Sequence, residues 1–247
     1  MRWHRAIAVV AVGLYVAAVG RDQFDSWVEA TLIPPLVIET GQEVLDRHGD
    51  LLRAYQVDDG RWRLAADVST VDPDYLRMLV AYEDKRFYDH AGVDLIALAR
   101  AFGQAIRYQR MVSGASTLTM QTARLLEDSG TGRWEGKLRQ ARLALALERR
   151  LSKDQILNLY LQRAPFGGNL EGVRAASLAY FGKEPRRLTP AQSALLVALP
   201  QAPEPRRPAR KPEAAHEARS AWLPAFGVAP VGPTECRKHR SQDQIHH

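Results

Sequence analysis

One short segment gathers the residue types that acid–base chemistry uses. The run Tyr82-Glu-Asp-Lys-Arg-Phe-Tyr-Asp-His-Ala-Gly-Val-Asp94 places two adjacent carboxylates, Glu83 and Asp84, before a turn that contains His90 and Gly92. Successive side chains on a helix diverge by about 100°, so one carboxylate can face a cleft while the other holds the turn. A carboxylate in a cleft can accept a proton from a hydroxyl group. The alternative is a solvated acidic helix end with His90 as a local hydrogen-bond partner.

A second segment has small residues followed by hydroxyls, in the order Ser113-Gly-Ala-Ser-Thr-Leu-Thr-Met-Gln-Thr-Ala-Arg124. The free backbone N–H groups and the positive dipole end of a helix that starts here suit phosphate or sugar oxygens. Gln121 and Arg124 are three residues apart and share one face of that helix. The alternative is an ordinary Ser/Thr helix cap without a ligand.

A third segment, residues 137–153, is basic and helical in pattern. Lys137, Gln140, Ala144 and Glu148 follow three- and four-residue steps, so they form one stripe with a small residue in the middle. The small residue allows a substrate or another helix to come close. The alternative is a basic amphipathic helix whose charges are solvated.

The elements that must position these side chains are mostly helical. Residues 37–63 mix β-forming residues with turn signals, which predicts one small hairpin or two. A helical spacing of apolar residues begins at residue 72 and continues through residue 106. Gly167-Gly168 interrupts the chain. Further helices are expected over residues 116–126, 134–151, 152–161, about 171–180 and 189–199.

The N-terminus carries a targeting or anchoring segment. Arg2 and Arg5 precede an uncharged apolar run over residues 6–19, which ends at Arg21-Asp22. The run has 14 residues, fewer than the roughly 20 of a full membrane span, so a cleaved signal peptide competes with a single membrane anchor. A helix buried in the core is a third, weaker alternative. The basic flank places everything after Gly20 outside the cytoplasm in both membrane readings.

These observations predict four regions and a mainly α fold. Residues 1–22 are the anchor or signal segment, 23–65 a stalk with a small β element, 66–205 a helical domain, and 206–247 a Pro/Arg-rich tail without fixed structure. The formal charge of +6 and the pI of about 9.6 suit a polyanion, an acidic membrane or a phosphate-bearing substrate. No nucleic-acid-binding motif is present. The single cysteine, Cys236, excludes an intramolecular disulfide.

Together the segments resemble the ordered motifs of the peptidoglycan glycosyltransferase family. The matching motifs are Glu83-Asp84-x-x-Phe87-x-x-His90-x-Gly92, Gly114-Ala-Ser-Thr-Leu-Thr-Met-Gln121, Lys137-x-x-Gln140, Ser152-Lys-Asp-Gln-Ile-Leu157 with Tyr160-Leu161, and Ala175-Ala176 with Tyr180-Phe-Gly-Lys183. The segments Gln162-Arg-Ala-Pro-Phe-Gly-Gly168 and Leu199-Pro-Gln-Ala-Pro203 look most similar to the penicillin-binding protein 1C branch. The resemblance implies a lysozyme-like, two-lobed helical domain. It implies lipid II and the growing glycan strand as ligands, membrane lipids and other cell-wall synthesis proteins as partners, and no nucleic acid.

The resemblance also implies residue roles. Glu83 matches the family's general base, and Lys137 matches a cation that meets the pyrophosphate of the donor. The other positions that match substrate-binding segments are Asp84, His90, Ser116, Thr117, Gln121, Arg124, Gln140 and Lys183. No cofactor is required by the sequence, although a divalent cation, Mg or Mn, can assist the leaving diphosphate. The implied location is the inner membrane, with the catalytic domain on the periplasmic or extracytoplasmic side.

The chain departs from the family pattern at several positions. Gln140 stands where most members have a second glutamate, Gln162 stands where most have asparagine, and Ala115 replaces a usual glycine. Neither Ser-x-x-Lys nor Lys-Thr-Gly, the motifs of a penicillin-binding transpeptidase, occurs in this sequence. A lysozyme-type hydrolase needs a second carboxylate across the cleft, and the sequence offers none at the matching place. A lipid II-binding or scaffold protein without catalysis is the main alternative function.

Overall fold

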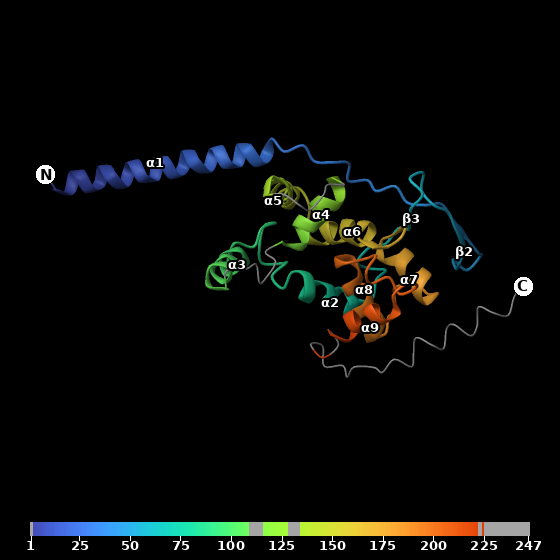
Figure 1. Ribbon diagram of the computed structural model, residues 1–247. Helices are drawn as coiled ribbons and strands as arrows, with labels where there is room; N and C mark the ends of the chain where they lie inside the picture. Colours follow the sequence, from blue (N-terminus) through green and yellow to red (C-terminus); the bar gives the residue numbers. More distant parts are fainter. Residues whose placement is uncertain (1, 109–115, 128–133, 222–223, 225–247) are drawn as a thin grey trace, which may run out of the picture.

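The chain is mainly helical, as predicted, with small β elements (Figure 1). The structure, a computed structural model, describes all residues except 1, 109–115, 128–133, 222–223 and 225–247. The helices are α1 (Arg2–Glu29), α2 (Pro73–Glu83), α3 (Leu95–Tyr108), α4 (Leu118–Glu127), α5 (Trp134–Glu148), α6 (Lys153–Arg163), α7 (Val173–Phe181), α8 (Pro190–Ala198) and α9 (Pro212–Ser220), with a 3-10 turn η1 (Leu199–Gln201). The strands are β1 (Glu43–Leu45), β2 (Leu51–Ala54), β3 (Trp62–Arg63), β4 (Pro165–Gly167) and β5 (Leu170–Glu171).

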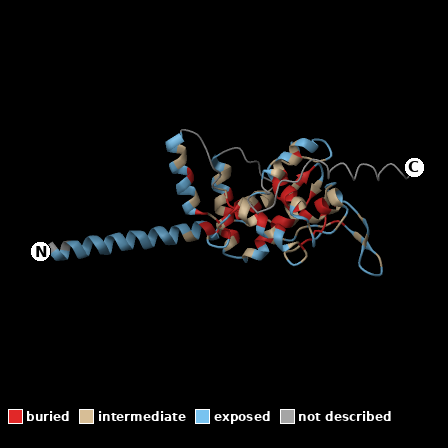
Figure 2. Cartoon of the chain, turned by 90° about the horizontal axis from the view of Figure 1, so that it is seen from below, coloured by how far each residue is buried: buried red, intermediate tan, exposed pale blue. Residues whose placement is uncertain are grey.

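Helix α1 projects away from the rest of the molecule, and its side chains are almost all exposed (Figures 1 and 2). It has 28 residues, so it continues beyond the apolar run and past the expected boundary at residue 22. By length and composition, Ala6–Glu29 is able to cross a membrane, a property that anchors and signal sequences share. The predicted N-terminal apolar segment is therefore present as one helix.

The end of α1 is attached to α5. Arg142 donates from Nε and Nη2 to the Trp27 carbonyl oxygen, at 3.0 and 2.7 Å, and its guanidinium lies 4.7 Å from the centre of the Trp27 ring. A cation at the carbonyl end of a helix stabilises the helix dipole and the unpaired carbonyl groups. Val28 is fully buried at this joint. Residues 23–29 are therefore part of a helix that is fixed to the domain, where the sequence predicted a stalk.

The prediction of one small hairpin or two within residues 37–63 is confirmed with one hairpin. Strands β1 and β2 form the expected antiparallel hairpin. A second hairpin does not form, because β3 pairs in parallel with β5, which in turn pairs antiparallel with β4. The expected break at Gly167-Gly168 is the turn between β4 and β5, where φ angles of 104° and 60° favour glycine. Glu171 is buried at the end of β5 and accepts a hydrogen bond from Arg63 at 2.7 Å.

Local capping sets the beginnings of several helices. Ser152 and Thr189 each form a complete capping box, with Gln155 and Gln192 respectively. Such a cap stabilises a helix by about 1 kcal/mol. The prediction of an N-cap at Ser152 is confirmed. Helix α4 begins at Leu118, two residues later than predicted, because Thr117 caps it: Thr117 Oγ1 accepts a hydrogen bond from the Met120 N–H at 3.1 Å, and the Asp84 carboxylate accepts one from the Leu118 N–H.

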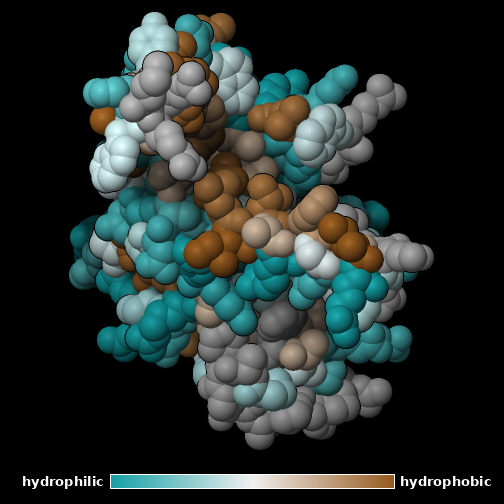
Figure 3. Space-filling model, turned by 90° about the vertical axis from the view of Figure 1, so that its left-hand side faces the viewer, coloured by the Kyte–Doolittle hydropathy of each residue, from teal (hydrophilic) through white to brown (hydrophobic). Residues whose placement is uncertain are grey.

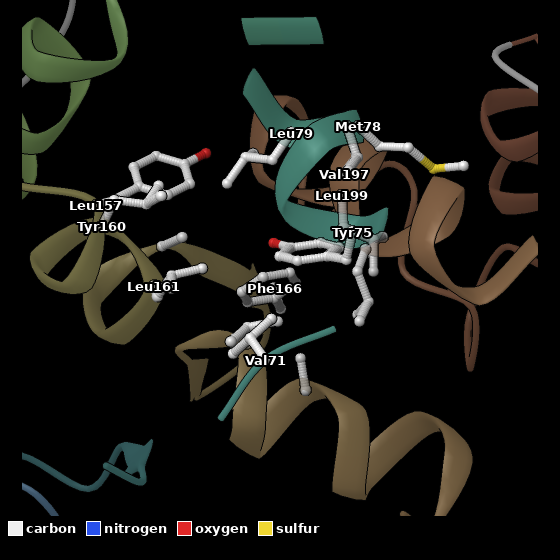
Figure 4. Close-up of a cluster of buried hydrophobic side chains, with 14 of the residues drawn as sticks. Val71, Tyr75, Met78, Leu79, Leu157, Tyr160, Leu161, Phe166, Val197 and Leu199 are labelled. Carbon is white, nitrogen blue, oxygen red and sulfur yellow. The ribbon is translucent and has the colours of Figure 1, made fainter. Parts of the chain in front are cut away.

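The larger core cluster joins α2, α6, α7 and α8 (Figure 4). Tyr75, Tyr160 and Phe166 are among its fully buried side chains. A smaller cluster contains Ala123, Leu143 and Leu147, from α4 and α5. Burying a large apolar side chain contributes about 1.5–3 kcal/mol, so these clusters fix the relative positions of the helices that carry the polar motifs.

Helix α9 corrects the prediction that residues 206–247 lack structure. It packs against α8, with Ala215 and Arg219 buried (Figure 1). Pro212 occupies the first helical position, where its fixed φ and missing N–H are compatible with a helix. The run of prolines therefore ends at a helix start, and the Pro/Arg composition alone did not reveal this. Residues 222–223 and 225–247 lie outside the described part of the chain.

Candidate active site

A cleft of about 480 Å³ lies among the three motif segments. Its lining residues come from the ends of α2 and η1, from α4 and the residues just before it, and from α5. They are Tyr82, Glu83, Ser116, Gln121, Arg124, Lys137, Gln140, Pro200 and Gln201. The fold thus brings together six of the ten site residues that the sequence predicted.

Glu83, the last residue of α2, faces this cleft. Its Oε2 accepts a hydrogen bond from Gln121 Nε2 at 2.7 Å, and its Oε1 accepts one from Gln201 Nε2 at 3.4 Å. Burial raises the pKa of the Glu83 carboxyl, and the two amide bonds and the nearby Arg124 oppose that rise. A partly desolvated carboxylate with a raised pKa is suited to accept a proton.

Asp84 turns away from the cleft. Its Oδ2 accepts a hydrogen bond from the Leu118 N–H at 2.9 Å and lies 2.9 Å from His90 Nε2. His90 Nδ1 in turn accepts from the Gly92 N–H at 3.1 Å. Thr117 Oγ1 donates to the Gly92 carbonyl oxygen at 2.5 Å. Asp84, His90 and Thr117 therefore tie the turn to the start of α4 behind the cleft and do not line it, and the two adjacent carboxylates diverge as predicted.

Two cations and a buried amide line the cleft beyond Glu83. Lys137 Nζ donates to Ser116 Oγ at 2.8 Å. Burial, and then the positive charge of Arg124, lowers the pKa of Lys137. Gln140 is 1% exposed, and its Nε2 has no hydrogen-bond partner among the described residues. Lys137, Arg124 and Gln140 thus offer two positive charges and an unused N–H donor, which suits an anionic ligand.

The chain's similarity to known proteins agrees with this arrangement. Residues 48–226 match the family described as Transglycosylase. The chain belongs to the transglycosylase family. The matched range covers most of the chain and includes every residue of the cleft. The predicted resemblance to peptidoglycan glycosyltransferases is confirmed at the level of the family.

Several relatives of this transglycosylase family member are penicillin-binding proteins. Penicillin-binding protein 1C of Escherichia coli (strain K12) is 42% identical over 232 residues, which are 94% of this chain and 29% of that protein. Penicillin-binding protein 1F of Bacillus subtilis (strain 168) is 31% identical over 188 residues, which are 76% of this chain and 26% of that protein. The chain therefore spans less than a third of the length of these relatives.

One solved structure is also similar. The crystal structure of penicillin-binding protein 1A from Haemophilus influenzae aligns with a TM-score of 0.41 and 18% identity. The alignment covers 85% of this chain and 21% of that one.

The predicted stripe of residues on α5 has two roles in this transglycosylase domain: some of its side chains line the cleft, and the others pack inside the domain. Lys137 and Gln140 line the cleft, whereas Ala144 is fully buried. A Cβ atom on Gly92, where φ is 97°, would lie 2.7 Å from the Ala144 carbonyl oxygen. Glu148 accepts hydrogen bonds from Thr119 and Lys153, both at 2.7 Å. The small residue therefore admits the Gly92 turn, rather than a substrate or another helix.

Lys183 is a predicted site residue that does not line the cleft. It follows the left-handed C-cap Gly182 of α7. Three lining residues, Tyr82, Pro200 and Gln201, were not predicted as site residues. The available signals were the motif Leu199-Pro-Gln-Ala-Pro203 and the position of Tyr82 directly before Glu83. Residue spacing does not reveal that two segments more than a hundred residues apart in the sequence meet in one cleft.

Proposed function

We propose that this chain polymerises lipid II into β-1,4-linked glycan strands, with undecaprenyl diphosphate as the leaving group. The observation that carries this proposal is the placement of Glu83 in one cleft with Lys137 and Arg124. One side of the reaction needs a proton acceptor, and the other needs positive charge to stabilise a leaving diphosphate. Membership of the transglycosylase family and the names of the related penicillin-binding proteins support the same reaction class.

In the proposed reaction, Glu83 accepts the proton of an acceptor N-acetylglucosamine 4-hydroxyl as its oxygen attacks the anomeric carbon of the donor. The bond between that carbon and the diphosphate oxygen breaks on the opposite face, so the anomeric configuration inverts. The electron pair of the broken bond stays with the diphosphate. Lys137, Arg124 and the Gln140 Nε2 donor can bind its oxygens by charge-assisted and neutral hydrogen bonds.

A resident divalent cation does not fit the groups that the described residues present. Glu83 is the single carboxylate among the described residues that line the cleft, and each of its oxygens accepts one amide hydrogen bond. The neighbouring Asp84 carboxylate is engaged by Leu118 and His90. Among the described residues, no group of three or more His, Cys, Asp or Glu side chains could hold a metal ion. The proposed mechanism therefore assigns the stabilisation of the diphosphate to Lys137 and Arg124.

The proposed location is the outer face of the inner membrane, with α1 as the anchor. Helix α3 supports membrane contact, because it exposes a row of large apolar side chains: Leu95, Ile96, Leu98, Phe102 and Ile106. Figure 3, which views the molecule from the side where α1 projects, shows apolar residues gathered on this face. Membrane attachment places the cleft near a lipid-linked substrate. Because the chain belongs to the transglycosylase family, we also propose that other cell-wall synthesis proteins are its partners.

The decisive experiment uses the purified full chain in detergent with lipid II, and gel separation of the glycan products. We expect the wild-type chain to produce glycan strands and the Glu83→Gln variant to produce none. If the chain binds lipid II but forms no strands under any divalent-cation or pH condition, it is a lipid II-binding or scaffold protein. If it neither binds nor polymerises lipid II, both functions are wrong.

A further inference from the structure

One side chain from a distant turn bridges two consecutive residues at the end of α2. Gln201, the last residue of η1, accepts a hydrogen bond from the Tyr82 hydroxyl at its Oε1, at 2.6 Å. Its Nε2 donates to Glu83 Oε1 at 3.4 Å. The bridging amide lies 119 and 118 residues from its two partners in the sequence. Packing of α8 against α2 brings the turn to this position.

The orientation of this amide follows from the chemistry of its partners. An ionised carboxylate can only accept hydrogen bonds, so the Gln201 NH₂ group must face Glu83. The amide oxygen then faces Tyr82, whose hydroxyl donates to it. A donor bonded to an amide oxygen polarises the amide and strengthens its N–H bonds as donors. Tyr82 therefore reinforces the hydrogen bond that Glu83 receives.

The Glu83 carboxylate is thus held between two amides from different elements. Gln121 of α4 binds Oε2 at 2.7 Å, and Gln201 of η1 binds Oε1. The last torsion of a glutamate side chain is broad, so a single hydrogen bond leaves the carboxylate plane free to rotate. Donors on both oxygens restrict that rotation. They leave further lone pairs of the carboxylate available for a hydroxyl group in the cleft.

We infer that Gln201 is a positioning residue for the general base: supported by Tyr82, it fixes the Glu83 carboxylate in the orientation that receives the proton of the acceptor hydroxyl. This inference rests on the proposed function. Gln201 acts through Glu83 and does not itself react.

The pH dependence of the rate distinguishes this role from a purely structural one. Gln201 donates to the ionised form of Glu83, so its loss raises the pKa of Glu83, and the acidic limb of the rate profile moves to higher pH. The other charged or titratable groups that face Glu83 are unchanged by a substitution at Gln201. They are Tyr75 and Tyr82 on α2, Asp84 directly after that helix, Arg124 on α4, Lys137 on α5 and Tyr160 on α6.

The test compares Gln201→Met, which keeps the length of the side chain but removes the amide, with Tyr82→Phe and the double variant. Loss of a hydrogen bond to a charged group predicts a decrease in kcat of about 3- to 10-fold for Gln201→Met. The KM for lipid II should stay within about twofold, since the contact acts on the base. Tyr82→Phe should have the same effects as Gln201→Met in direction: a lower kcat and an acidic limb at higher pH. The double variant should lose no more than Gln201→Met alone, because Tyr82 acts through the same amide.

Gln192→Met is the matched control, since it removes a capping amide from α8 without touching the cleft. It should lower thermal stability and leave the acidic limb in place. A raised KM with an unchanged kcat and acidic limb in Gln201→Met would show that Gln201 binds substrate. If kcat, the acidic limb and thermal stability change equally in Gln201→Met and Gln192→Met, then Gln201 only stabilises the fold. Either result overturns the inference.

A second measurement does not depend on activity. The Glu83 carboxyl carbon of the full chain in detergent is titrated by ¹³C NMR, and its resonance is identified by its loss in Glu83→Gln. A higher Glu83 pKa in Gln201→Met than in the wild type is the expected result, and equal values overturn the inference. Absence of polymer from the wild-type chain would refute the proposed function, while this titration would still decide the role of Gln201.

Discussion

Gln121 on α4 donates a 2.7 Å hydrogen bond to Glu83 at the end of α2. This bond joins two of the motif segments across the cleft. The position of Gln121 depends on the start of α4, which Asp84 fixes through the Leu118 N–H. One of the two adjacent carboxylates therefore faces the cleft, while the other positions the helix that supplies its partner.

Replacement of Glu83 by glutamine should abolish polymerisation while the fold is kept. The amide has the shape of the carboxylate but cannot accept the proton, and a general base contributes about 10²-fold or more to the rate. Initial rates of strand formation from lipid II measure the effect, and thermal unfolding tests the fold. A variant that keeps its rate within a few-fold of the wild type would show that Glu83 is not the base.

The rate should depend on pH through two groups in the cleft. Because burial raises the pKa of Glu83, the ionised base is lost as pH falls through a value above that of an ordinary glutamate. Because burial and Arg124 lower the pKa of Lys137, its positive charge is lost at a lower pH than that of an ordinary lysine. The kcat/KM profile should therefore be bell-shaped.

Lys137→Arg identifies the alkaline limb. A guanidinium stays charged throughout this range, so the limb should move to higher pH while the acidic limb stays in place. An alkaline limb that is identical in the wild type and in Lys137→Arg would assign it to another group.

Gln140→Glu should slow the reaction. The amide cannot ionise, whereas a carboxylate at this buried position adds negative charge near Lys137 and Arg124, where the diphosphate develops charge. We expect a decrease in rate of about tenfold, corresponding to about 1.4 kcal/mol, and partial recovery with added Mg²⁺. The measurement is the polymerisation rate at several Mg²⁺ concentrations, with Gln140→Leu as the neutral control. An inert wild type that Gln140→Glu activates would identify the natural chain as a lipid-binding protein without catalysis.

Gly92→Ala should destabilise the domain by about 2–4 kcal/mol. The φ of 97° is unfavourable for alanine, and the added Cβ would lie 2.7 Å from the Ala144 carbonyl oxygen. Urea unfolding measures the change. Gly103→Ala, inside α3, is the matched control, because no heavy atom of a neighbouring side chain or segment among the described residues lies within 4 Å of its added Cβ. Gly103→Ala should increase the free energy of unfolding by about 0.5–1 kcal/mol. Equal effects of the two substitutions would contradict the close contact between Gly92 and Ala144 of α5.

The sequence by itself determined the features that depend on neighbouring residues. Helices α2 to α8 followed from the spacing of apolar residues, and the cap at Ser152 followed from a hydroxyl three residues before Gln155. The divergence of Glu83 and Asp84 follows from the rotation of about 100° per residue in a helix. Glu83, Gln121 and Lys137 were named as site residues because the motifs that contain them resemble those of the peptidoglycan glycosyltransferase family in type and order.

Only the tertiary structure decided which of these residues share the cleft. Asp84 and His90 lie behind it, Lys183 is absent from its lining, and Gln201 enters it from η1. The pairing of β3 with β5 and the packing of α9 on α8 were likewise not predicted. These contacts join segments whose approach depends on how buried side chains of several helices pack together, and no local spacing encodes that packing.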